Sequence, residues 1–147
     1  MSYISNLAHF IWSTAKREPT ILVEWEQRLY PYIGGILDHH KAKLLCIGGV
    51  ADHVHIFASL PSTLSLADAA GAMKANSSRF VHEELGDRSF DWQKGYVAFS
   101  VSVSGEEVVR RYIENQKTHH MRRSFQEELI EFLDKHRVPY DPRYVFL

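Results

Sequence analysis

The sequence predicts an α+β fold of the ferredoxin-like type, extended by two further helices at its C-terminal end. Short apolar runs rich in branched and aromatic residues indicate four strands. Apolar residues at helical spacing indicate one helix after the first strand and another after the third. The resulting order β-α-β-β-α-β is that of a ferredoxin-like sandwich, and two helix-start patterns after the fourth strand predict the additional helices.

The expected elements follow one another along the chain without a repeat or a linker. In order, they are a strand at 7–13, a helix at 24–40, strands at 43–48 and 53–60, a helix at 65–84, a strand at 96–103, and helices at about 108–120 and 128–136. Ser65 is expected to cap its helix. Ser104 with Glu107 and Ser124 with Glu127 match the capping-box pattern. In this topology both inner helices cover one sheet face, which leaves the other face of the central strand 53–60 open for function.

Length and composition indicate an ordinary globular protein. The 147 residues are enough for a single domain, 1–147, and the 45% hydrophobic and 24% charged content is typical of such domains. No apolar run approaches the ~20 residues of a membrane helix, and the N-terminus lacks the signal-peptide pattern. A lone Cys46 excludes an internal disulfide, so we expect a cytoplasmic protein with no membrane partner. The net charge of −1 means that any nucleic-acid surface must be local.

Two histidines flank a valine in the run Asp52-His53-Val54-His55. Because alternate residues of a strand share a face, both imidazoles can bind one metal ion. In the first late helix, Tyr112 and Gln116 are four residues apart and are therefore surface neighbours. Imidazole nitrogens suit Mn, Zn and similar ions, and an amide oxygen adds a hard ligand acceptable to Mg or Mn. Three protein ligands leave positions open for phosphate oxygens. Each of these residues alone is also compatible with a purely structural role.

Together with their surroundings, these residues resemble the single-tyrosine transposases of the HUH class, which include the IS200-like insertion-sequence enzymes and their REP-associated relatives. The letters HUH describe histidine, hydrophobic residue, histidine, as in His53-Val54-His55. The similarity extends through almost the whole chain in the same order, over the segments HFIWSTAKREP, LADAAGAMKANSSRF, WQKGYVAFSVS, YIENQ, HHMRRSFQEEL and HRVPYDPRYVF.

The resemblance implies a DNA transposase that cuts and rejoins single-stranded DNA. Tyr112 would attack phosphorus and form a 5′-phosphotyrosine link with release of a 3′-hydroxyl. His53, His55 and Gln116 would hold one Mg or Mn ion. The resemblance further implies a homodimer that recognises DNA hairpins, in which Tyr112 serves either its own metal site or that of the partner.

Local basic residues are the candidate DNA contacts, because the net charge provides no general attraction for phosphates. These candidates are Lys16, Arg17, Lys74, Arg79, Arg122 and Arg123. His9 is either a partner of the metal site or a core histidine, and Trp12 and Trp92 either lie in the core or stack on unpaired bases. His119 and His120 are adjacent and point about 100° apart on a helix, which favours a solvated or DNA-facing pair over a joint metal site.

Two other functions remain open at this point. The first is a metal-dependent nuclease or phosphodiesterase in which Tyr112 is structural and water attacks; a trapped protein–DNA adduct would exclude it. The second is a non-catalytic nucleic-acid-binding module, because the same element order occurs in RNA-recognition domains. Those domains present aromatic side chains on the open sheet face, whereas this sequence offers His53 and His55 there.

Overall fold

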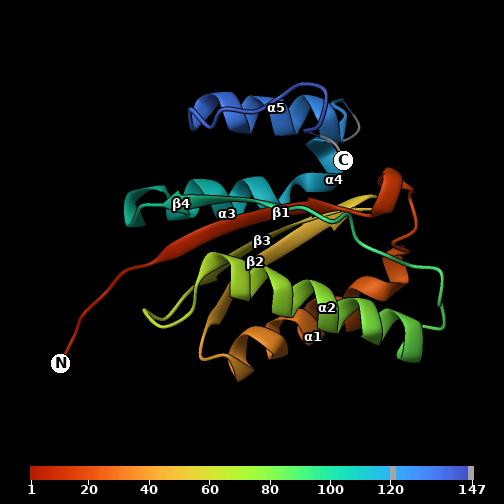
Figure 1. Cartoon of the computed structure of the whole chain (residues 1–147), viewed down its shortest axis with the longest axis horizontal. Coiled ribbons are helices and arrows are strands. Elements are labelled where there is room, and N and C mark those ends of the chain that lie inside the picture. Colours follow the sequence, from red (N-terminus) through yellow and green to blue (C-terminus); the bar gives the residue numbers. More distant parts are fainter. Residues whose placement is uncertain (120–121, 146–147) are drawn as a thin grey trace.

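The structure is a computed structural model that describes residues 1–119 and 122–145. An antiparallel four-stranded sheet lies between two layers of helices (Figure 1). Its strands are β1 (Leu7–Ser13), β2 (Lys43–Val50), β3 (His53–Ser59) and β4 (Val97–Val101). The helices are α1 (Glu26–His39), α2 (Leu66–Glu84), α3 (Glu106–Glu114), α4 (Gln116–His119) and α5 (Phe125–Lys135), and the short 3-10 turns are η1 (Ala15–Arg17), η2 (Val23–Trp25) and η3 (Val103–Gly105).

The strand order β2-β3-β1-β4 confirms the predicted ferredoxin-like topology, and α3, α4 and α5 follow β4 where two helices were predicted. Every neighbouring pair is antiparallel, and β1 and β3 are central. Ile11 pairs with His55 and His9 pairs with Phe57, so these side chains belong to one face of the sheet. The histidine pair thus lies on a central strand, where backbone hydrogen bonds on both sides fix its position.

The first face of the sheet packs against α1 and α2. Apolar side chains from both layers form the main core, including Phe10, Trp12, Val54, Ile56, Leu29, Ile33, Met73 and Val81. Trp12 and Trp92 are 0% and 4% exposed, and their rings pack edge to face with centroids 5.9 Å apart. Both indoles therefore belong to the core, and the alternative that they stack on unpaired DNA bases is wrong.

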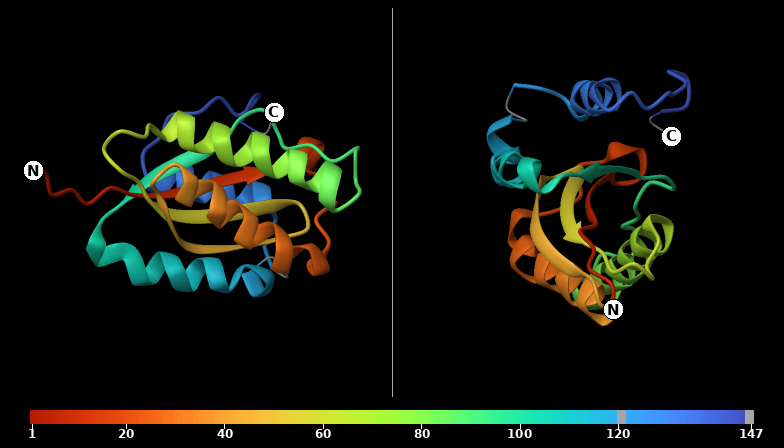
Figure 2. Two further views of the ribbon diagram at one scale, coloured as in Figure 1. Left: turned by 90° about the horizontal axis from the view of Figure 1, so that it is seen from below. Right: turned by 90° about the vertical axis from the view of Figure 1, so that its left-hand side faces the viewer.

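The second face carries the histidines and is covered by α3 and α5, which lie on the side of the sheet opposite α1 and α2 (Figure 2). Ile113 of α3 packs with Leu7 and Phe57. Leu129 and Leu133 of α5 pack with Ile11 and Phe99. Between these two apolar clusters, side chains of β1 and β3 point toward both α3 and α5.

Two of the predicted helix caps form, and one does not. The Oγ atoms of Ser65 and Ser124 accept the backbone N–H groups of Asp68 and Glu127 at 3.0 and 3.1 Å. The capping box predicted at Ser104 is wrong, because α3 begins after Gly105 without a side-chain cap. A capping serine needs an extended backbone, as at Ser65 and Ser124, whereas Ser104 lies inside η3.

The predicted helix 108–120 is divided in the structure. α3 ends at Glu114, Asn115 adopts φ −97° and ψ 17°, and α4 starts at Gln116. Asparagine commonly ends helices, which accounts for a break that apolar spacing does not reveal. Gln116 nevertheless stays one turn beyond Tyr112, with its Nε2 3.5 Å from the Tyr112 carbonyl oxygen. The elements expected at 24–40 and 96–103 are also shorter, since η2 replaces the start of the helix and β4 spans five residues.

Candidate active site

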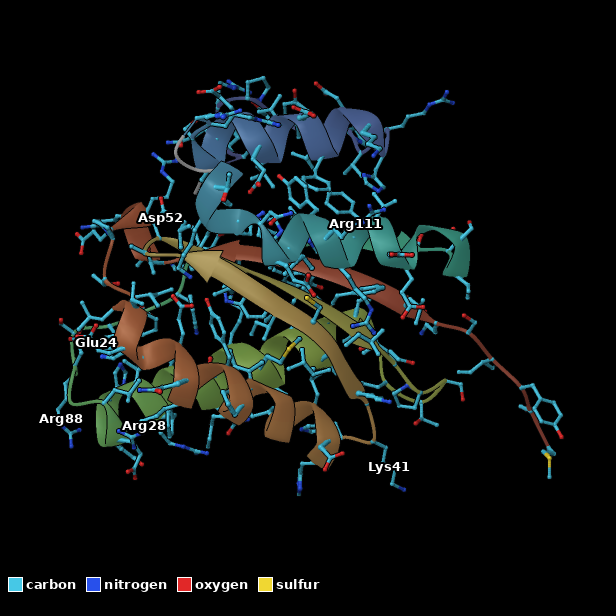
Figure 3. The ribbon with its side chains drawn as sticks, turned by 180° about the vertical axis from the view of Figure 1, so that it is seen from behind. Glu24, Arg28, Lys41, Asp52, Arg88 and Arg111 are labelled. Carbon is cyan, nitrogen blue, oxygen red and sulfur yellow. The ribbon has the colours of Figure 1, made fainter. Side chains whose placement is uncertain are left out.

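His53 and His55 are completely buried on β3, with both Nε2 atoms facing the space beneath α5. The other ring nitrogen of each histidine, Nδ1, lies within hydrogen-bond distance of a different side chain. His53 Nδ1 is 2.7 Å from Asp52 Oδ1, and His55 Nδ1 is 2.8 Å from His9 Nε2. Figure 3 shows Asp52 at the end of the sheet, close to the start of α4. These contacts fix both rings so that they present the same nitrogen to one point.

A carboxylate from α5 reaches that point. Glu128 Oε1 lies 2.9 Å from His55 Nε2 and 3.3 Å from His53 Nε2. The three ligand atoms lie within 4.8 Å of one another, and the Glu128 side chain is buried. Carboxylate oxygen and imidazole nitrogen are common ligands of divalent cations. The group therefore has the composition and spacing of a metal site.

Glu128 is not among the site residues predicted from the sequence. A signal for it exists, because Phe125, Leu129 and Leu133 form the buried stripe of α5 and Glu128 interrupts that stripe at helical spacing. An acidic residue on the buried side of an amphipathic helix requires a partner, since an isolated buried charge is costly. The signal indicates a buried carboxylate but does not reveal which strand it meets.

Gln116 and Tyr112 complete the cluster. The side-chain oxygen of Gln116, Oε1, is 3.2 Å from His53 Nε2. The side-chain nitrogen of Gln116, Nε2, donates to Glu128 Oε2 at 3.2 Å. The Tyr112 hydroxyl donates a hydrogen bond to the same Glu128 oxygen. The rings of Tyr112 and His55 have centroids 5.7 Å apart. All four site residues expected from the sequence are thus brought together, from three elements, around one unexpected carboxylate.

The surroundings shift the pKa values of His53, His9 and Tyr112 in different directions. Burial lowers the pKa of His53, but hydrogen bonds to Asp52 and Glu128 outweigh it and raise that pKa to about 9. Burial and the neighbouring His55 lower the pKa of His9. Burial and the hydrogen bond to Glu128 raise the pKa of Tyr112 well above its usual range, and this outweighs the opposite effects of Gln116 and the nearby Arg123. In this arrangement Tyr112 is held as the neutral phenol.

Four of the predicted DNA contacts lie near α5. Lys16 and Arg17 form η1 with φ values of 56° and 55°, a backbone conformation that non-glycine residues rarely adopt. Arg17 lies against the side-chain amide of Gln126 on α5. Arg122 is exposed, and Arg123 pairs with Glu131. These basic groups approach the site from the β1 end and from the segment that leads into α5.

The other two candidates lie on α2, which covers the opposite face of the sheet (Figure 1). Lys74 Nζ donates to the carbonyl oxygens of Lys94 and Gly95 at 3.0 and 2.8 Å. Arg79 donates to Asn76 Oδ1 at 2.7 Å. The six candidates therefore do not form one patch. His120 and the side chain of His119 lie outside the described residues, so the prediction for that pair stays a prediction.

Two cavities flank the cluster. One, of about 190 Å³, lies between α3 and α5 and is lined by Val108, Tyr112 and Phe132 among others. The other, of about 520 Å³, lies beside Asp52 and is lined partly by Phe125. Arg123 lines both cavities, and Lys117 lines the second. The site thus has open space on either side, each bordered by a basic side chain.

The chain matches the family model described as "Transposase IS200 like" over residues 2–116, which is more than half of its length. The chain belongs to the IS200-like transposase family. This confirms the resemblance drawn from the sequence and identifies the chain as a transposase, a DNA-processing enzyme. The family match ends at Gln116, so α5 and Glu128 lie beyond it.

Two curated proteins are similar to this transposase in sequence, and two solved structures are similar to it in fold. The transposases for insertion sequence element IS200 of Salmonella typhimurium and Salmonella typhi are each 22% identical over 114 residues, 74% of either chain. A putative transposase of Deinococcus radiodurans R1 superimposes with a TM-score of 0.61 at 24% identity, covering 79% of this chain and 95% of that one. A REP-associated tyrosine transposase bound to a REP hairpin superimposes with a TM-score of 0.62 at 17% identity, covering 82% and 72%. Among the described residues, no helix has the length and apolar character to span a bilayer.

Proposed function

We propose that this transposase cleaves and rejoins single-stranded DNA through Tyr112, assisted by a divalent metal ion held at His53, His55, Glu128 and Gln116. The observation that carries the proposal is the double role of Glu128. One of its oxygens accepts the Tyr112 hydroxyl, and the other contacts the Nε2 atoms of both histidines. The nucleophile and the metal-binding atoms therefore lie within the span of one carboxylate.

The donor set fits Mg or Mn. Two imidazole nitrogens, a carboxylate oxygen and an amide oxygen converge, and these hard and borderline ligands suit such ions. Glu128 is 1% exposed, and a cation would neutralise this buried carboxylate. Gln116 alone was expected as the third ligand, whereas the charge on Glu128 makes it the stronger donor of the two. When bound, the ion would polarise the scissile phosphate and favour the ionised form of the phenol.

In the proposed reaction, the Tyr112 hydroxyl oxygen attacks phosphorus as the phenol loses its proton, and the bond from phosphorus to the 3′-oxygen breaks. The 3′-oxygen leaves with the bonding electron pair and takes up a proton from water, so the products are a 5′-phosphotyrosine and a free 3′-hydroxyl. Glu128 Oε2 is the acceptor already hydrogen-bonded to the phenol. Because the covalent link conserves the phosphodiester energy, a second 3′-hydroxyl can reverse the step and join strands.

Access to the site requires movement of α5. His53, His55, Gln116 and Glu128 are each no more than 1% exposed, so a phosphate group cannot contact them in this arrangement. Phe125 covers His53, with ring centroids 4.6 Å apart. We infer that α5 shifts away from α3 and the sheet when DNA binds. The cavity between α3 and α5 leaves unfilled space along one side of α5.

We propose hairpin-bearing single strands as the substrate and a homodimer as the active form. The solved relative bound to a REP hairpin supports the first part. Lys16, Arg17, Arg122 and Arg123 are the favoured DNA contacts because they lie on the side of the active site. Lys74 and Arg79 are less favoured because they lie beyond the sheet. The position of Tyr112 beside His55 of the same chain supports attack within one subunit.

The proposal is tested by trapping the covalent intermediate. The protein is incubated with Mn or Mg and a set of end-labelled single strands that carry short hairpins, and the products are separated under denaturing conditions. We expect a labelled species that migrates more slowly than the free strand and disappears after protease treatment. Cleavage without any such adduct would favour the hydrolytic nuclease, and binding without cleavage would favour the non-catalytic module.

A further inference from the structure

His55 is held by another histidine, whereas His53 is held by a carboxylate. His9 lies on β1, where it pairs with Phe57, and its side chain reaches diagonally to His55 on the neighbouring strand. His9 Nε2 is 2.8 Å from His55 Nδ1, and the two ring centroids are 5.0 Å apart. On the other histidine, Asp52 Oδ1 occupies the equivalent position, 2.7 Å from Nδ1.

The direction of the His9–His55 hydrogen bond follows from the chemistry of imidazole. A neutral ring carries one proton, on one of its two nitrogens. When His55 Nε2 gives its lone pair to a cation, the proton must be on Nδ1, and this N–H then donates to His9. His9 must therefore present an unprotonated Nε2 as the acceptor. The contact fixes both the tautomer and the rotation of the His55 ring.

The His9 ring is itself held from three sides, and it is 2% exposed. Phe132 of α5 packs on it edge to face with centroids 5.3 Å apart, and Phe99 of β4 does so at 6.4 Å. His9 can therefore keep its Nε2 aimed at His55 with little freedom to turn. Side chains of β4 and α5 thus both contact this ring and contribute to its orientation.

We propose that His9 is a positioning residue of the metal site, which acts as a neutral hydrogen-bond acceptor for His55 and sets its ligand nitrogen. The inference rests on the proposed function, because it assumes that His55 binds a metal ion. The proposal also makes His53 and His55 unequal in strength as metal ligands. A carboxylate acceptor raises the basicity of the histidine that it holds, and a neutral acceptor does so less. His53, backed by Asp52, is the stronger ligand, and His55, backed by His9, is the weaker one.

A matched pair of variants separates the effect of the hydrogen-bond acceptor on His9 from the effect of its packing. His9→Gln keeps an oxygen near the position of Nε2, whereas His9→Met has a similar length and volume but no comparable acceptor. Affinity for Mn is measured by calorimetry on the full chain without DNA, after thermal unfolding has shown that each variant folds. We expect His9→Met to bind Mn roughly 10- to 100-fold more weakly than the unmodified protein, which is the usual effect of losing such a contact. His9→Gln should stay close to the unmodified protein.

A second measurement uses the unmodified protein and does not depend on the folding of any variant. Nitrogen-15 spectra of the histidine rings in the Mg-loaded chain should show a proton on Nδ1 of His55 and none on Nε2 of His9. The reverse tautomers would overturn the proposal, as would equal Mn affinity in His9→Met or an equal loss in both variants. If the unmodified protein binds no Mn at all, the metal site under the proposed function fails, and the inference fails with it.

Discussion

The Tyr112 hydroxyl donates a hydrogen bond to Oε2 of Glu128, whose Oε1 lies 2.9 Å from His55 Nε2. Tyr112 comes from α3 and Glu128 from α5, so the bond also joins the two helices that cover the second face of the sheet. Under the proposed function, a shift of α5 would break this bond and uncover the histidines in the same movement. Opening of the site would then also release the proposed nucleophile, Tyr112.

Replacing Tyr112 with Phe removes one hydroxyl and should abolish cleavage and adduct formation while binding of hairpin DNA persists. Glu128 Oε2 keeps its contact with Gln116, so the free energy of unfolding should fall by only about 1 kcal/mol. Gel assays and denaturant titration measure the two effects. Tyr30→Phe is the control, because it removes a buried hydroxyl that has no hydrogen-bond partner among the described residues. Cleavage by the Tyr112 variant at the usual rate would reassign the nucleophile.

Replacing Glu128 with Gln keeps the shape of the side chain and removes its charge. We expect Mn affinity to fall by at least roughly tenfold, which corresponds to about 1.4 kcal/mol, and by more than in Gln116→Met, where a neutral ligand is lost. Calorimetry gives both values. Glu131→Gln on the same helix is the control, since that exposed side chain pairs with Arg123. A larger loss at Gln116 than at Glu128 would restore the three-ligand site predicted from the sequence.

The parts of the site that could be predicted from the sequence are those fixed by local geometry. His53 and His55 share a face because strand side chains alternate, and Tyr112 and Gln116 are neighbours because a helical turn brings residues four apart together. Glu128 could not be placed in this way, because its contact with β3 depends on how α5 packs over the sheet. The same limit applies to the break at Asn115, which depends on backbone angles that apolar spacing does not determine.

Gly48→Ala should destabilise the protein and reduce cleavage. A Cβ at this position would lie 2.5 Å from the Ile113 carbonyl oxygen, so α3 would have to move away from β2. We expect a loss of roughly 1–3 kcal/mol in unfolding free energy and a displaced Tyr112, which lies one residue from Ile113. Gly35→Ala is the control in α1, because a Cβ at that position would meet nothing within 4 Å. This substitution should raise the free energy of unfolding by about 0.5–1 kcal/mol. Urea titration of both variants decides whether the close approach matters.

Ser124→Ala should weaken the start of α5. Its Oγ accepts the Glu127 N–H at 3.1 Å, and loss of such a cap costs about 1 kcal/mol. Because α5 carries Glu128, Mn affinity should fall together with stability. Ser104→Ala provides the comparison, since Ser104 does not cap α3 and should change the unfolding free energy by only a few tenths of a kcal/mol. Equal losses in the two variants would show that Ser104 contributes more than its place in η3 indicates.

Arg123→Gln should reduce both DNA affinity and its dependence on salt. Arg123 lines both cavities beside the site, and its positive charge lowers the pKa of Tyr112. A true phosphate contact contributes about one unit to the slope of log affinity against log salt, so the variant should lose that amount for every hairpin sequence tested. Arg79→Gln removes the same charge from α2, on the far side of the sheet, and should leave the slope unchanged. Fluorescence titrations at several salt concentrations give the slopes. A drop in the Arg79 variant and none in the Arg123 variant would mean that DNA binds across α2, and the path to Tyr112 would then have to run around the sheet edge instead of beneath α5.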